Sequence, residues 1–196
     1  QQEKGAHILD VNVGLPELDE VQLLQDAVFN LQSVLSLPLQ LDSSNTQALE
    51  KAMRMYNGKA MINSVNGKQS SMSEVFPLVQ KYGGVVVCLC LDESGIPETA
   101  QGRIDIAKKI IKTAESYGID KKDLVVDALV MTISTNKDNA KETLKAVDYI
   151  RHELGVGTVL GVSNISFGLP KREAINTAFF TLALKAGLSA GIINPL

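Results

Sequence analysis

Five short apolar segments of the chain carry an aspartate or an asparagine at or near their carboxyl end. The segments are 7–13 with Asp10 and Asn12, 37–42 with Asp42, 60–63 with Asn63, 124–127 with Asp127 and 159–164 with Asn164. A carboxylate or amide inside an apolar layer is costly, by several kcal/mol, unless it is hydrogen-bonded. Because the same pattern recurs at the same end of each segment, it predicts one shared polar site where strands converge.

Aspartate and asparagine limit what this site can bind. An ionised Asp only accepts hydrogen bonds, whereas Asn both donates and accepts. A phosphate site would call for Arg, Lys or helix amides instead. Several Asn residues, only two histidines and no paired ligand spacing also argue against a metal cage. We therefore expect a polar organic ligand and no metal.

The composition is that of an ordinary globular domain. The 196 residues are 45% hydrophobic and 21% charged, with a net charge of −3, so no basic surface for nucleic acid is expected. No apolar run reaches the length of a membrane span, and the start at Gln1 is not a signal peptide. Cys88 and Cys90 suit neither a disulfide framework nor a zinc site, so we expect buried thiols and a cytoplasmic protein.

Strand and helix patterns alternate along the whole chain, which predicts one domain over residues 1–196. Strands are predicted at 7–13, 37–42, 60–65, 84–91, 124–130, 158–163 and 188–193, and helices at 18–34, 45–57, 72–82, 99–117, 138–154 and 170–186. Ser44 with Gln47 and Ser71 with Glu74 fit capping boxes at helix starts. Glycines such as Gly155 follow the helical segments, where a left-handed residue commonly ends a helix.

This alternation predicts a parallel α/β fold, either a doubly wound open sheet or a (β/α)8 TIM barrel. The single G-x-G, at 155–157, lies between a helix and a strand, so it is read as a helix stop rather than a dinucleotide-binding turn. A barrel gathers the carboxyl ends of all strands around one axis and explains polar residues on nearly every strand. Since seven strands are visible, we expect the first strand before Gln1 and the last helix after Leu196.

Five motifs in chain order resemble the pterin-binding barrel family, in particular the folate-binding domains of cobalamin-dependent methionine synthases. The motifs are Asp-Val-Asn-Val-Gly at 10–14, Leu-Asp-Ser-Ser-Asn at 41–45, Met-Ile-Asn-Ser at 61–64, Val-Asp-Ala-Leu at 126–129 and Gly-Val-Ser-Asn-Ile-Ser-Phe-Gly-Leu-Pro at 161–170. The resemblance implies that Asp42, Asn63, Asp127 and Asn164 line the pterin site with Asn12 nearby. It also places Arg172 close to the substrate.

Each of these residues also has a purely structural interpretation. Asp42 can cap the following helix, for which Ser44 is the better candidate, and Asn63 can anchor a turn through its own backbone. A structural role is harder to support for Asp127, because an unpaired buried charge is costly. Asp10 and Asn12 alternate on one strand, and the sequence leaves open which of them faces the ligand.

The resemblance implies that the substrate is 5-methyltetrahydrofolate and that its methyl group passes to cob(I)alamin carried by a separate domain or protein. A chain without a Ser-His or Cys-His nucleophile fits this reaction, because the corrinoid supplies the nucleophile. Asn164 is the residue expected to act catalytically, at the pterin N5. The sequence leaves open whether the domain forms a homodimer.

Three other functions compete with this one. A methyltransferase that uses methyltetrahydrofolate and a corrinoid/iron–sulfur protein shares the site and the chemistry. Dihydropteroate synthase shares the barrel, but would place a lysine where Ser163 and Asn164 stand. A barrel that only binds or scaffolds is the non-enzymatic alternative, since a fold by itself assigns no function.

Overall fold

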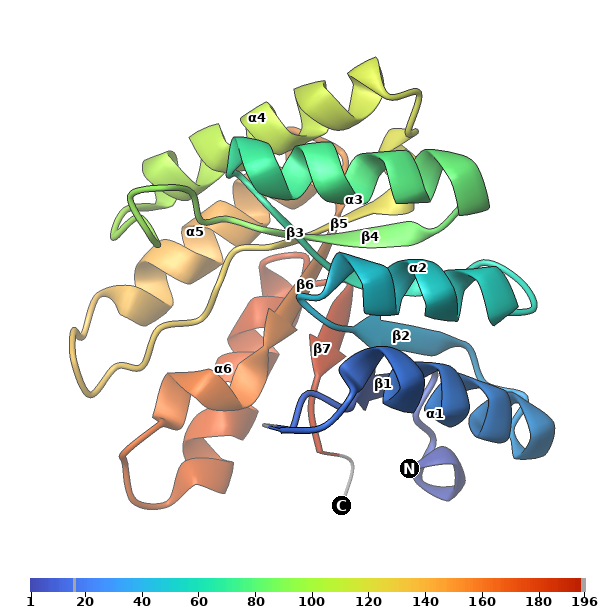
Figure 1. The fold of residues 1–196 in the computed structure, drawn as a ribbon. Coiled ribbons are helices and arrows are strands. Elements are labelled where there is room, and N and C mark those ends of the chain that lie inside the picture. The colour runs from blue at the N-terminus through green and yellow to red at the C-terminus, as the bar shows by residue number, and fades with distance from the viewer. Residues whose placement is uncertain (16, 195–196) are drawn as a thin grey trace.

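Seven parallel strands form one continuous sheet in the computed structural model, which describes residues 1–15 and 17–194. Neighbours in the sheet follow chain order, and the sheet curves into a nearly closed barrel (Figure 1). The strands are β1 Leu9–Asn12, β2 Leu39–Asp42, β3 Met61–Asn66, β4 Val85–Leu89, β5 Leu124–Asp127, β6 Gly157–Gly161 and β7 Ala190–Ile192. The predicted alternation of parallel strands and helices around a barrel is confirmed.

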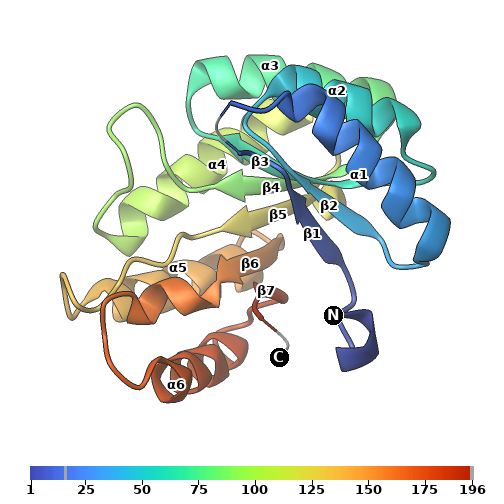
Figure 2. The same cartoon turned by 60° about the horizontal axis from the view of Figure 1, so that its bottom comes forward.

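The helices cover the outside of this sheet (Figure 2). They are α1 Glu20–Val34, α2 Thr46–Met55, α3 Gln69–Tyr82, α4 Ala100–Ser116, α5 Asn139–His152 and α6 Arg172–Lys185, with 3-10 turns η1 Gln2–Lys4, η2 Lys121–Asp123 and η3 Val162–Ser166. Each predicted helix and strand is present, with its ends displaced by three residues or fewer. Within the described ranges, no helix is both long and apolar enough to cross a membrane.

Alternate residues of each strand face opposite sides of the sheet and divide the apolar side chains into two groups. Val86, Cys88 and Val126 face outward and join the large core between sheet and helices. Val87 and Val159 face inward and belong to a small separate cluster inside the barrel. Both faces are covered, which explains why the strands read as continuous apolar runs.

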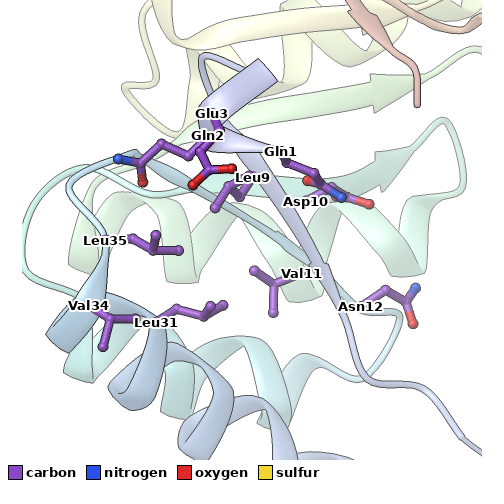
Figure 3. Close-up of a pocket in the computed structure, with 10 residues that line it drawn as sticks. All are labelled: Gln1, Gln2, Glu3, Leu9, Asp10, Val11, Asn12, Leu31, Val34 and Leu35. Atoms are coloured by element: carbon purple, nitrogen blue, oxygen red, sulfur yellow. The ribbon is translucent and has the colours of Figure 1, made fainter. Parts of the chain in front are cut away.

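On β1, the inward positions are polar. Leu9 and Val11 point toward α1, whereas Asp10 and Asn12 point to the other side of the strand (Figure 3). β1 and β7 form the two edges of the sheet, because among the described residues β1 pairs only with β2 and β7 only with β6. A groove of about 650 Å³ follows the free edge of β1, so the interior is accessible there.

This arrangement confirms the predicted seven-stranded sheet with two unpaired edges. The strand expected before Gln1 and the helix expected after Leu196 stay predictions. The helix stop at 155–157 is confirmed, since Gly155 follows α5 with φ 68° and Gly157 begins β6.

Both predicted capping boxes are wrong. The cap of α2 is Asn45, whose Oδ1 accepts hydrogen bonds from the amides of Gln47 and Ala48 at 3.0 and 3.3 Å. Ser44 lies one residue too early to reach these amides. Helix α3 begins at Gln69, so Ser71 is already inside it, and its hydroxyl accepts from the Asn66 amide instead.

The observed cap yields a first prediction. Asn45→Ala should lower the free energy of unfolding by about 1 kcal/mol, because two first-turn amides lose their acceptor. Ser44→Ala is the matched control and should leave stability unchanged within about 0.5 kcal/mol. Urea unfolding of both variants measures the difference, and equal losses would show that Asn45 is not the effective cap.

Candidate functional site at the carboxyl ends of the strands

Asn12 and Asp42 end β1 and β2, and Asn63 continues their row across the middle of β3. The strand register pairs Asn12 with Asp42 and Asp42 with Asn63. The Asn12 Nδ2 donates a hydrogen bond to the Asp42 Oδ2 at 2.9 Å, and the Asn12 Oδ1 accepts from the Gly14 amide at 3.0 Å. The structure therefore brings these three predicted residues together as neighbours on the inward face.

The structural interpretations of Asp42 and Asn63 lose their support. Asp42 does not cap α2, since Asn45 does. The turn after β3 is anchored by Asn66, whose Oδ1 accepts from the Lys68 amide at 2.9 Å. The Asn63 side chain instead helps to line a hollow of about 360 Å³ that also reaches Asp42. Both residues therefore border this hollow, and their contact with a ligand stays a prediction.

A second polar pair joins the exposed Asp10 of β1 to the buried Gln40 of β2. The Gln40 Nε2 donates to the Asp10 Oδ1 at 2.5 Å, one alternate position below the pair of Asn12 and Asp42. Burial raises the pKa of Asp10, the Gln40 hydrogen bond lowers it, and the negative charge of Asp42 raises it further. Asp10 and Asn12 thus both face inward, and Asn12 is the one at the mouth.

Asp127 ends β5 on the inward face and is almost completely buried, with 8% of its surface exposed. Its Oδ1 accepts a hydrogen bond from the Leu129 amide at 2.7 Å. Burial raises the pKa of Asp127 to about 7, although the Leu129 amide and the positive charge of Arg103 lower it. With this pKa, the charged and neutral forms of Asp127 are both populated near pH 7. A ligand that donates hydrogen bonds to the carboxylate would favour the charged form.

Asn164 lies in η3, directly after β6, and its side chain is exposed. The amide approaches Gly161, an inward position at the end of β6, where an added Cβ would lie 3.1 Å from the Asn164 Nδ2. Glycine therefore leaves room for the amide at the mouth of the barrel. Asp127 of β5 pairs in register with Val159 of β6, two residues before Gly161.

Arg172 braces the segment that carries Asn164. Its Nη2 donates to the Ser163 carbonyl at 3.0 Å and its Nε to the Ser166 hydroxyl at 3.1 Å. The Ser166 hydroxyl also donates to the Asn176 Oδ1 at 2.7 Å. These bonds hold η3 against α6, and the predicted contact of Arg172 with a substrate stays a prediction.

Sequence reasoning missed Gln40 and Arg103. Gln40 shares a strand face with Asp42, a period-two signal that the sequence does contain. Arg103 is fully buried in α4, on the same face as Ala107 and Ile110. An arginine on the apolar face of a predicted helix was therefore the feature of the sequence that could have revealed it.

No group of three or more His, Cys, Asp or Glu side chains in the part of the chain that the structure describes is arranged to hold a metal ion. The amides and carboxylates of Asn12, Asp42, Asn63 and Asp127 offer both hydrogen-bond donors and acceptors.

Comparison with known proteins identifies the family. The family model described as pterin binding enzyme matches residues 1–194. The chain belongs to the pterin-binding enzyme family. It is 34% identical over 208 residues to a methionine synthase of Mycobacterium tuberculosis, covering 99% of this chain and 17% of that protein. The chain thus spans about a sixth of the length of this curated relative.

Two further relatives extend the comparison. A methylcorrinoid:tetrahydrofolate methyltransferase of Eubacterium limosum is 27% identical over 200 residues, which is all of this chain and 73% of that protein. A dihydropteroate synthase from Xanthomonas albilineans, solved in complex with 7,8-dihydropteroate, superposes with a TM-score of 0.74 at 22% identity, over 97% of this chain and 74% of that one. At that identity, the structural likeness shows the fold alone.

The burial of Asp127 yields a second prediction. Its carboxyl titrates near pH 4 when unfolded and at about 7 when folded, so the folded state keeps a proton that the unfolded state has lost between these values. The free energy of unfolding should therefore fall as pH rises from about 4 to about 7 and level off above. Asp127→Asn should remove this fall, which is on the order of a few kcal/mol.

Urea unfolding between pH 4 and pH 8, without ligand, measures the effect. The advantage of Asp127→Asn over the parent protein should grow with pH up to about 7. The exposed Asp105→Asn is the control for loss of one negative charge. A constant difference between Asp127→Asn and the parent across this range would contradict the assignment.

Proposed function

We propose that this domain binds 5-methyltetrahydrofolate and activates its N5-methyl group for transfer to cob(I)alamin carried by another domain or protein. The observation that carries the proposal is the set of Asn12, Asp42, Asn63 and Asp127 on the inward face at one end of the barrel. Membership of the pterin-binding enzyme family and the similarity to a methionine synthase support it.

The recognition chemistry follows from the pterin ring. Its edge presents a 2-amino group, a ring N–H and a carbonyl, so it needs acceptors next to groups that also donate. The ionised Asp127 accepts only, and its Oδ1 already receives the Leu129 amide, which leaves Oδ2 for the ligand. The Asn63 amide, next to Asp42 in the row, can both donate and accept hydrogen bonds.

The methyl transfer needs no nucleophile from this domain. Cob(I)alamin supplies the nucleophile in this reaction. Burial raises the pKa of Cys88 to about 12 and that of Cys90 well above its ordinary value, so neither thiol is a candidate for covalent catalysis. The chain's task is to hold the folate and to stabilise N5 as it leaves.

N5 is a poor leaving group unless it gains a proton or a strong hydrogen bond. When the bond between N5 and the methyl carbon breaks, its electron pair stays on N5, which must then be stabilised or protonated. We assign the stabilisation of N5 to the Asn164 amide. Asn164 lies in η3, and its side chain occupies the space that the missing side chain of Gly161 leaves at the mouth of the barrel. An amide is a donor rather than an acid, so the proton reaches N5 from water through the polar row.

The reverse direction is the second candidate. One relative is named as a methylcorrinoid:tetrahydrofolate methyltransferase, and this chain spans 73% of it. The same contacts stabilise the same transition state in both directions, so the site serves methyl transfer from a methylated corrinoid to tetrahydrofolate equally well. Dihydropteroate synthesis is less favoured, because Ser163 and Asn164 stand where a lysine is expected.

Two measurements on the purified protein test the function. Calorimetric titration with 5-methyltetrahydrofolate should show saturable binding, and added cob(I)alamin should lose its absorbance only when protein and folate are both present. Formation of dihydropteroate from a dihydropterin diphosphate and 4-aminobenzoate is the competing activity. Folate binding without methyl transfer in either direction would contradict the proposed enzymatic activity and indicate a protein that only binds folate. Formation of dihydropteroate would also overturn the proposal.

A third prediction concerns the pterin anchor. Asp127→Asn should weaken 5-methyltetrahydrofolate binding about tenfold or more at pH 8, because an acceptor-only group is replaced by an amide that can present a donor to the ligand's donors. Thermal unfolding of the variant controls for the fold. An affinity within twofold of the parent protein would show that Asp127 is structural.

A fourth prediction separates catalysis from binding at Asn164. Asn164→Ala should slow single-turnover methyl transfer to cob(I)alamin by roughly a hundredfold to a thousandfold and weaken folate binding much less. The reason is that only interactions that strengthen in the transition state raise the chemical rate. Equal losses in rate and affinity would mean that Asn164 merely holds the ground state, and an undiminished rate would remove it from the mechanism.

A further inference from the structure

Arg103 is a completely buried arginine in α4 that no ion pair within 4.0 Å neutralises among the described residues. Its Nε donates to the Pro97 carbonyl at 2.9 Å, and its Nη1 donates to the Leu129 carbonyl at 3.0 Å and to the Thr143 hydroxyl at 2.6 Å. Its Nη2 is buried without a hydrogen-bond partner. A buried guanidinium is costly when it is not fully paired, so its retention calls for an explanation.

The contacts of Arg103 converge on the segment after β5. Leu129 has a left-handed backbone, with φ 60°, which is unfavourable for a side chain of this size. Its carbonyl accepts from Arg103 and, at 3.3 Å, from the Thr143 hydroxyl, while its amide donates to the Asp127 Oδ1 at 2.7 Å. One residue, held from both sides, therefore links the guanidinium to the carboxylate.

The charges around Asp127 leave Arg103 as its main positive neighbour. Among the residues that the structure describes, Arg103 is the charged group that acts on the pKa of Asp127, and it lowers this pKa against the effect of burial. Cys90, buried directly after β4, lies close enough to act on both of them, and Cys88 lies within β4. Both thiols are neutral because burial raises their pKa. From α5, Glu142 acts on Arg103, and its Oε2 accepts from the Ala100 amide.

We propose that Arg103 is a positioning residue for pterin recognition: it clamps the Leu129 carbonyl and, through the backbone of Leu129, fixes the Leu129 amide that orients the Asp127 carboxylate. The proposal rests on the proposed function, because it assigns Asp127 to the ligand. The guanidinium also supplies the positive charge that favours the ionised, acceptor-only form of Asp127. Arg103 lies in α4, on the outer side of the sheet, so in this role it does not contact the ligand.

The fifth prediction removes the charge. In Arg103→Met, the pKa of Asp127 in the ligand-free protein should rise by about one unit. Binding of 5-methyltetrahydrofolate should weaken about fivefold at pH 7, because the ionised fraction of the carboxyl falls from about one half to about one tenth, and the loss should shrink at pH 9, where the carboxyl ionises again. A merely structural role would weaken binding by the same factor at both pH values.

The measurement is the 13C carboxyl signal of Asp127, assigned by its absence in Asp127→Asn, followed against pH together with the folate dissociation constant. Thr143→Val is the control for loss of hydrogen bonding without loss of charge, because it removes the buried hydroxyl that contacts both Arg103 and Leu129 and keeps the guanidinium. The pKa of Asp127 should then stay within about 0.3 of the parent value. Arg103→Lys keeps the positive charge, so the pKa of Asp127 in this variant should lie close to that of the parent protein. An unchanged Asp127 pKa in Arg103→Met would overturn the proposal.

A readout in the unmutated protein covers the case in which Arg103→Met does not fold. The Leu129 amide and the Arg103 Nε signals in 15N spectra should titrate with the same midpoint as the Asp127 carboxyl, and both titrations should vanish in Asp127→Asn. If the Arg103 signal does not follow Asp127, the link is refuted. These spectra need no ligand, so failure of folate binding would count against the proposed function alone.

Discussion

The site depends on how one carboxylate is kept inside the barrel. Asp127 is almost wholly removed from water, and burial raises its pKa to about 7, so neither its charged nor its neutral form is strongly favoured near neutrality. A single backbone amide, that of Leu129, bonds one of its oxygens. The resulting balance leaves the group responsive to a ligand, because each added donor stabilises the charged form. Surrounding apolar strands make this possible by excluding water.

The parallel sheet separates packing from chemistry. Outward positions such as Val86 and Val126 join the core beneath the helices, and their loss would destabilise the fold. Inward positions carry apolar residues in the middle of the barrel, among them Val87 and Val159, and polar residues at the carboxyl ends. Since consecutive side chains alternate between faces, the two sets tolerate different residues without interfering. This is the usual arrangement of a barrel site.

The polar groups divide the work among different elements. The row on β1 to β3 is linked internally, with Asn12 bonded to Asp42, while Asn164 sits on a 3-10 turn that Arg172 braces against α6. In the proposed function, strand ends suit recognition of a flat ring, and the braced turn suits the group that we assign to N5. A corrinoid acceptor supplies the nucleophile in the proposed reaction, which fits a site made only of hydrogen-bonding groups.

The sequence by itself determined the fold class and most of the inward polar residues. Alternating strands and helices predicted a parallel sheet, and polar residues late in apolar segments marked Asp42, Asn63 and Asp127, while the choice between Asp10 and Asn12 stayed open. These features depend on local periodicity, which a sequence displays directly. It misplaced the caps of α2 and α3, because Ser44 and Asn45 both have side chains that suit a cap and only the exact helix start distinguishes them.

Only the tertiary structure decided how these residues are held. The bond from Asn12 to Asp42 joins residues 30 apart in the chain, and the bond from Arg103 to Leu129 joins α4 to the segment after β5 across 26 residues. Burial of Arg103, the neutral thiols and the raised pKa of Asp127 depend on which atoms surround each group in three dimensions. The sequence names the residues, but distance and desolvation, which set their energies, exist only in the folded chain.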